Sequence, residues 1–60
     1  MTRDLRLVVH CDSAAFDDDE EVPRILRYFA NYCERGLENT DVPVFDVNGN
    51  KVGFFRVTVR

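Results

Sequence analysis

The spacing of apolar residues predicts a helix in the middle of the chain. From residue 22 these residues recur at i, i+3, i+4, i+7 and i+11, which is one face of a 3.6-residue repeat, and they are Val22, Ile25, Leu26, Phe29 and Cys33. Pro23 lacks an N–H and fits only within the first helical turn, so the N-cap lies no earlier than about Glu20. Gly36 suits the left-handed residue that follows a helix end.

Three other segments have the composition or the two-residue alternation of strands. Residues 4–10 alternate, and we expect the side that carries Leu5, Leu7 and Val9 to face the helix. Residues 42–47 and 51–60 are rich in β-branched and aromatic residues and flank Asn48-Gly49-Asn50, a strong hairpin signal. Either Asn48-Gly49 forms a two-residue turn, or Gly49 is the left-handed residue of a longer turn with a bulge.

The resulting order is β-α-β-β, which predicts an α+β fold in one small domain spanning residues 1–60. Pro43 cannot donate a ladder hydrogen bond, so the second strand belongs at a sheet edge. We expect a three-stranded antiparallel sheet in the order 1-3-2, with the helix packed on one face. The side chains expected on the helix side of the last two strands are Phe45, Val47, Phe55, Val57 and Val59. Those expected on the open face are Arg6, Val8, Val44, Asp46, Val52, Phe54 and Arg56. Phe16 is expected to fold back onto the core.

Composition narrows the classes of function. Sixty residues leave little room for a core, so dimerisation or a larger partner would add to stability. The net charge of −3 argues against direct binding to nucleic acid. No apolar run approaches the ~20 residues needed to cross a bilayer, and the N-terminus lacks the apolar core of a signal peptide, so we expect a cytoplasmic protein. Cys11 and Cys33 are then expected to remain thiols.

The segment His10-Cys11-Asp12-Ser13 contains the side-chain types of a nucleophilic mechanism, but their adjacency argues against one. Neighbouring residues on a strand point to opposite faces, and a reactive thiolate needs an electropositive setting rather than nearby acids. His10, Cys11, Asp12 and Cys33 also lack a recognised metal-ligand spacing. We therefore expect no catalytic residues, no metal site and no cofactor.

Two surface features suggest protein binding. Six carboxylates lie within ten residues, at Asp12, Asp17, Asp18, Asp19, Glu20 and Glu21. This run is either a solvated loop that supports the helix dipole or a patch that complements a basic protein surface. A stripe at three- and four-residue spacing lies along the helix flank and consists of Glu21, Arg24, Tyr28, Asn31, Tyr32 and Arg35. Its tyrosines either pack over the helix edge or belong to the same interface, since Tyr and Arg are enriched in interface hot spots. The candidate protein-binding residues are Asp17, Asp18, Asp19, Glu20, Glu21, Arg24, Tyr28, Tyr32 and Arg35.

The segments that carry a resemblance to known proteins are Ala14-Ala15-Phe16, the acidic run, Ile25-Leu26-Arg27 and residues 46–53. Through them, most of the chain resembles a group of very short proteins encoded by bacteriophages and prophages. Proteins of this size and acidity in that group include anti-CRISPR proteins, which cover the nucleic-acid sites of effector complexes. The resemblance implies a non-enzymatic inhibitor in the cytoplasm of a bacterial host, with a protein complex such as a CRISPR effector as its partner. The alternative is a phage assembly module that forms a homo-oligomer through the open sheet face or a strand edge.

Overall fold

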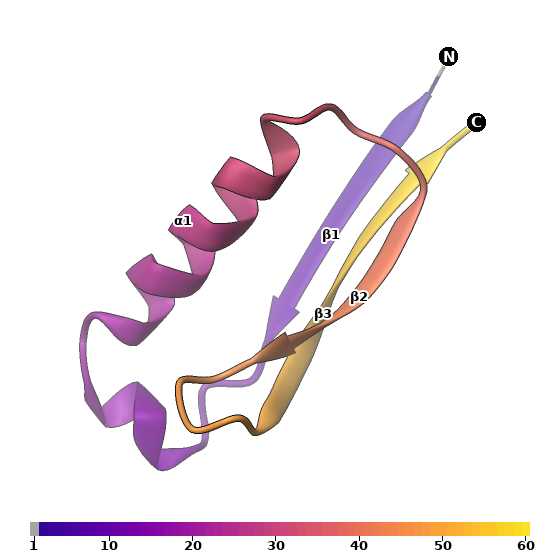
Figure 1. The fold of residues 1–60 in the computed structure, drawn as a ribbon. Coiled ribbons are helices and arrows are strands. Elements are labelled where there is room, and N and C mark those ends of the chain that lie inside the picture. Colours follow the sequence, from indigo (N-terminus) through magenta and orange to yellow (C-terminus); the bar gives the residue numbers. More distant parts are fainter. Residues whose placement is uncertain (1) are drawn as a thin grey trace.

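The fold consists of a three-stranded sheet with one helix layered against it (Figure 1). The computed structural model describes residues 2–60. Its elements, in chain order, are β1 (Arg3–Val9), the short 3-10 helix η1 (Ala14–Asp17), α1 (Glu21–Cys33), β2 (Thr40–Phe45) and β3 (Lys51–Val59). The predicted β-α-β-β order is confirmed, with η1 added in the first connection.

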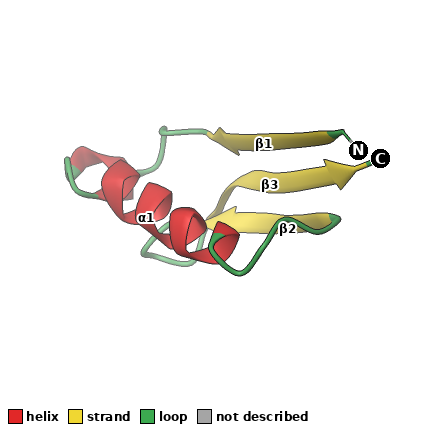
Figure 2. Cartoon of the chain, turned by 90° about the horizontal axis from the view of Figure 1, so that it is seen from above, coloured by secondary structure: helices red, strands yellow, loops and turns green. Residues whose placement is uncertain are grey.

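The sheet has the predicted topology, with β3 between β1 and β2 and antiparallel to both. Pro43 therefore lies on an edge strand, as its missing N–H required. Figure 2 shows that α1 crosses the sheet obliquely, and its C-terminal half lies beside β2 rather than β1. The helix consequently covers the sheet unevenly.

The start of α1 follows from the proline. Glu20 is the N-cap, and the first helical hydrogen bond runs from the Arg24 N–H to the Glu20 carbonyl, at 2.9 Å. Pro23 thus occupies a first-turn position where no helical donor is needed. At the other end the helix stops at Cys33, and Gly36 has φ of 105°, the predicted left-handed residue.

The core lies between α1 and the sheet. Phe29 of the helix stacks on Phe55 of β3 with ring centroids 4.6 Å apart. The fully or largely buried apolar side chains are Ala15, Ile25, Phe29, Val44, Val52, Phe55 and Val57. Phe16 packs against this cluster, as predicted, and so do Leu37 and the half-buried Cys33.

The buried face of α1 is rotated from the one that the apolar spacing predicted. Leu26 is 52% exposed and Val22 39% exposed, whereas Glu21 is only 4% exposed. Glu21, Ile25 and Phe29 are spaced four residues apart and form one row facing the sheet. The rotation brings a carboxylate into the interior because that carboxylate has partners there, described below.

The prediction for the faces of β2 was wrong. Val44 is buried, and Phe45 and Val47 are exposed, the reverse of the expected alternation. Val42 and Val44 stand opposite Phe55 and Gly53, which places them on the helix side. The pairing then shifts between Val44 and Phe45, so that Phe45 lies opposite Lys51. This irregularity leaves Val52 as an extra residue on β3 and adds it to the core, whereas β2 keeps its two-residue alternation in the phase opposite to the one predicted. Asp46, also expected on the open face, is buried.

Gly53 permits a close approach of β1 to β3. A Cβ at this position would lie 1.7 Å from the carbonyl oxygen of Val8. Leu7 and Val9 of β1 pack against the core from the helix side, as predicted. Leu5, on the same side of the strand but nearer the chain termini, remains 48% exposed because α1 does not extend over it.

Candidate protein-binding surface

A buried carboxylate organises the hairpin loop. The side chain of Asp46 accepts hydrogen bonds from the N–H groups of Asn48 and Asn50, at 2.9 and 2.8 Å, and from the Asn50 amide at 3.1 Å. The Ser13 hydroxyl donates to it at 2.7 Å from the β1–η1 connection, 33 residues away in the chain. The Gly49 N–H closes the turn on the Asp46 carbonyl at 3.0 Å, with Gly49 at φ of 86°. The longer turn with a left-handed Gly49 and a nearby bulge is therefore the correct alternative.

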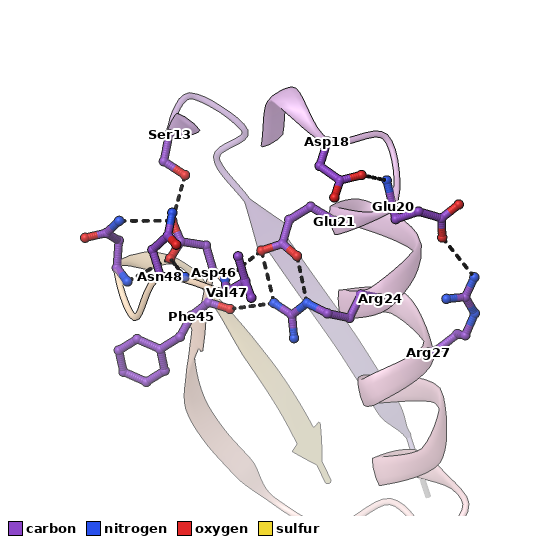
Figure 3. A network of polar contacts seen from close by, with 11 residues as sticks. Ser13, Asp18, Glu20, Glu21, Arg24, Arg27, Phe45, Asp46, Val47 and Asn48 are labelled. Atoms are coloured by element: carbon purple, nitrogen blue, oxygen red, sulfur yellow. Dashed lines mark hydrogen bonds and ion pairs between the residues drawn. The ribbon is translucent and has the colours of Figure 1, made fainter. Parts of the chain in front are cut away.

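A second buried carboxylate joins the helix to the same loop (Figure 3). Glu21 accepts two hydrogen bonds from the Arg24 guanidinium, at 2.7 and 3.1 Å, and one from the Val47 N–H at 2.7 Å. The guanidinium of Arg24 also donates to the Phe45 carbonyl at 3.4 Å. These contacts connect the first turn of α1 to the end of β2.

Both carboxylates are stabilised in their charged form. Hydrogen bonding from Arg24, followed by the Val47 N–H, lowers the pKa of Glu21 against the opposing effect of burial. The Ser13 hydroxyl, followed by donors of Asn50 and Asn48, lowers the pKa of Asp46 in the same way. Glu21 and Arg24, two candidate binding residues, thus have a structural role as well.

The other carboxylates of the acidic run are exposed. Asp17, Asp18, Asp19 and Glu20 form the lead-in to α1 at the hairpin end of the molecule, where η1 turns into the helix. Asp18 accepts from the Glu20 N–H at 2.9 Å, and Glu20 lies 3.6 Å from Arg27. Asp17 and Asp19 make no side-chain hydrogen bond or ion pair with residues 2–60, so their charges face solvent.

The aromatic stripe lies on the flank of α1 that faces the β2 edge. Tyr28 is 59% exposed, whereas Tyr32 packs edge-on against Phe55 with centroids 5.6 Å apart. A shallow hollow beside this flank is lined in part by Arg24, Tyr28 and Phe45. A second hollow is lined by Tyr28, Asn31, Tyr32 and Arg35. The stripe therefore lies next to two hollows of the surface, and Tyr28 is its most accessible aromatic ring.

The segment 10–13 lies in the connection between β1 and η1. The Ser13 hydroxyl donates to Asp46, and His10 and Cys11 are exposed. Within residues 2–60 no group of three or more His, Cys, Asp or Glu side chains is placed to hold a metal ion. Over the same residues, no helix is long and apolar enough to cross a membrane.

Three features of this surface were missed by sequence reasoning. An Asp three residues before a glycine is favoured at the first position of a turn, so the role of Asp46 had a signal. The burial of Glu21 could be anticipated only from its four-residue spacing to Ile25. The exposure of Phe45 had no signal, because it depends on the register of β2 against β3.

Comparison of the chain with models of protein families, with curated proteins and with solved structures gives no match.

Proposed function

We propose that this chain is a non-enzymatic binding protein of a phage or mobile element that inhibits a bacterial defence complex. Its acidic end and the adjoining helix flank would cover a basic protein surface that otherwise holds nucleic acid. The observation that carries the proposal is the pair of carboxylates at Asp17 and Asp19, which are exposed and have no basic partner in residues 2–60. Unneutralised charges of one sign at one end of a small protein favour oriented approach to an opposite charge.

The segments on either side of these carboxylates are joined to the rest of the fold by hydrogen bonds. Glu21 and Asp46 connect the helix start, the hairpin loop and the β1–η1 connection by hydrogen bonds of 2.7–3.1 Å. A preorganised acidic surface loses less conformational entropy on binding than a flexible loop would. Tyr28, 59% exposed on the neighbouring flank, supplies an aromatic anchor of the type common in hot spots.

The partner class follows from the sign of the charge and from the resemblance to short phage proteins. A groove that binds DNA or RNA carries a dense row of Lys and Arg, and clustered carboxylates compete for the same groups. The proposed contact is with protein, and the nucleic acid is the competitor.

The test is affinity capture from a bacterial lysate that contains a CRISPR effector, with the retained complex challenged by added DNA or RNA. The bait pair is the wild type and an Asp17→Lys/Asp19→Lys variant. Glu21 is left intact, because reversing a buried carboxylate would disturb the fold. The matched control is Glu34→Lys/Glu38→Lys, which makes the same change in net charge at exposed positions of the other helix end.

We expect the wild type and the control to retain a nucleic-acid-binding complex, nucleic acid to displace it, and the Asp17→Lys/Asp19→Lys variant to lose it. Equal retention by both double variants would reject the acidic end as the binding surface. Retention that added nucleic acid does not affect would reject competition for a nucleic-acid site.

A further inference from the structure

The two edges of the sheet are differently protected. The β2 edge contains Pro43, which has no N–H to offer a further strand. The β1 edge has seven residues, Arg3–Val9, and contains no proline. An unprotected edge strand of this length can pair with another strand.

The hydrogen-bonding pattern shows which groups of β1 face outward. Thr2 and Arg60 exchange backbone hydrogen bonds at 2.8 Å in both directions, and the His10 N–H donates to Val52 at 2.7 Å. Because hydrogen-bonded and non-hydrogen-bonded positions alternate along an antiparallel pair, even-numbered residues of β1 bond to β3. The N–H and C=O groups of Leu5 and Leu7 therefore point away from the sheet.

The open face of the sheet carries an incomplete row of charges. Asp41, Arg56 and Arg6 stand side by side across β2, β3 and β1. Asp41 lies 3.4 Å from the Arg56 guanidinium, but Arg6 makes no ion pair within residues 2–60. Like charges directly opposite one another, such as Arg6 and Arg56, destabilise a sheet. A carboxylate on the outer side of Arg6 would offset this repulsion, and the row has none there.

We propose that β1 pairs antiparallel with β1 of a second copy of this chain, and that Asp4 of each copy completes the charge row at Arg6 of the other. With Leu5 opposite Leu5 of the second copy, the two-fold axis places Asp4 opposite Arg6 twice, on the open face. The carboxylate of Asp4 keeps its contact with Arg60, at 3.0 Å, since it can accept more than one hydrogen bond.

The neighbouring two-fold registers are less favourable. Only odd-numbered residues of β1 present backbone groups to the edge, so an odd-numbered residue must pair with an odd-numbered one. Each residue can therefore change its partner only by two positions at a time. One step toward the N-terminus places Asp4 opposite Asp4, and one step toward the C-terminus places Arg6 opposite Arg6. The second of these would align four arginines, because Arg56 lies beside each Arg6.

The same register also covers exposed apolar surface. Leu5 is 48% exposed and stands opposite Val57 on the helix side of the sheet. Toward the chain termini β1 extends past α1 (Figure 2). In the dimer the two Leu5 side chains lie next to each other on that side, and both helices lie on the same face. The β2 strands form the outer edges, where Pro43 opposes further addition, so the assembly closes at two copies.

The test is analytical ultracentrifugation of wild type, Asp4→Lys and Arg6→Glu from about 10 µM to about 1 mM, the range suited to a small interface. We expect the wild type to dimerise, and each variant alone to need at least about tenfold higher concentration, because each places like charges opposite one another twice. An equimolar mixture of the two variants restores both opposite-charge pairs and should dimerise as the wild type does. Recovery in the mixture would also demonstrate that both variants are folded.

A measurement on the unmodified chain does not depend on the variants folding. We expect hydrogen exchange at the Leu5 and Leu7 amides to slow as the concentration rises, because these N–H groups acquire partners only in the dimer. A wild type that stays monomeric throughout, variants that associate as it does, or folded variants whose mixture stays monomeric would each overturn the proposal. The dimer is independent of the proposed binding to a defence complex, so either can fail alone.

Discussion

The two ends of this molecule are stabilised in different ways. At the hairpin end, the start of α1, the β1–η1 connection and the loop after β2 are joined through the buried carboxylates of Glu21 and Asp46. At the opposite end, where the chain termini lie, the sheet extends past the helix and Leu5 is half exposed (Figure 1). The ion pair there, Asp4–Arg60, is between side chains that are 52% and 71% exposed.

This difference indicates where a small core needs polar contacts. At the hairpin end, the backbone N–H groups of Val47, Asn48 and Asn50 in the loop after β2 donate to side chains rather than to a neighbouring strand. The carboxylates of Glu21 and Asp46 accept hydrogen bonds from these donors. A buried N–H group without such an acceptor would destabilise the fold. At the terminal end the strands form a regular sheet, so the backbone is already hydrogen-bonded along β3. The surface ion pair there adds only about 0–1 kcal/mol to the stability.

The largest expected effect is the removal of the Asp46 side chain. Asp46→Ala leaves donors of Ser13, Asn48 and Asn50 without their acceptor, so we expect a marked drop in the melting temperature followed by circular dichroism. Asp4→Ala is the control at the terminal end and should shift the midpoint only slightly. Equal shifts for the two variants would mean that the buried network is no more important than a surface pair.

The second-largest expected effect is a loss of stability at acidic pH, which arises at the hairpin end. The folded-state pKa values of Glu21 and Asp46 are lowered, so their stabilisation is fully present above the unfolded value of about 4 and is lost as the pH falls through the folded values. Urea midpoints measured from neutral to acidic pH should therefore fall most steeply below about pH 4. Asp46→Asn should flatten that fall, and an unchanged profile in this variant would exclude Asp46 as a source of it.

The smallest expected effect is at the terminal end. Leu5→Ala removes a half-exposed side chain and should lower the free energy of unfolding by about 1 kcal/mol or less, measured at low concentration to avoid self-association. Val44→Ala, at a position 1% exposed near the hairpin end, should cost about 2–4 kcal/mol. Similar losses at the two positions would show that the sheet is stabilised evenly along its length.

Much of the fold could be derived from local patterns, while the site could be derived only in part. The run Asp17–Asp19 was recognisable as lead-in because Pro23 restricts where the helix begins. Helical spacing predicted Tyr28 beside the buried face of the helix, and it is 59% exposed there. Which of the acids is buried had a single signal, the four-residue spacing from Glu21 to Ile25, and the partners of the buried carboxylate had none.

The sequence by itself determined the order of elements, a bound on the helix start near Glu20, the left-handed Gly36 after the helix, the hairpin and the edge position of Pro43, because each depends on the backbone chemistry of a few neighbouring residues. Only the tertiary structure decided which face of β2 is buried and which carboxylates lie inside. The register of β2 against β3 sets the exposure along β2, and the interior accepts Glu21 and Asp46 because distant donors meet them there. Both outcomes depend on contacts between segments far apart in the chain, which no local period encodes.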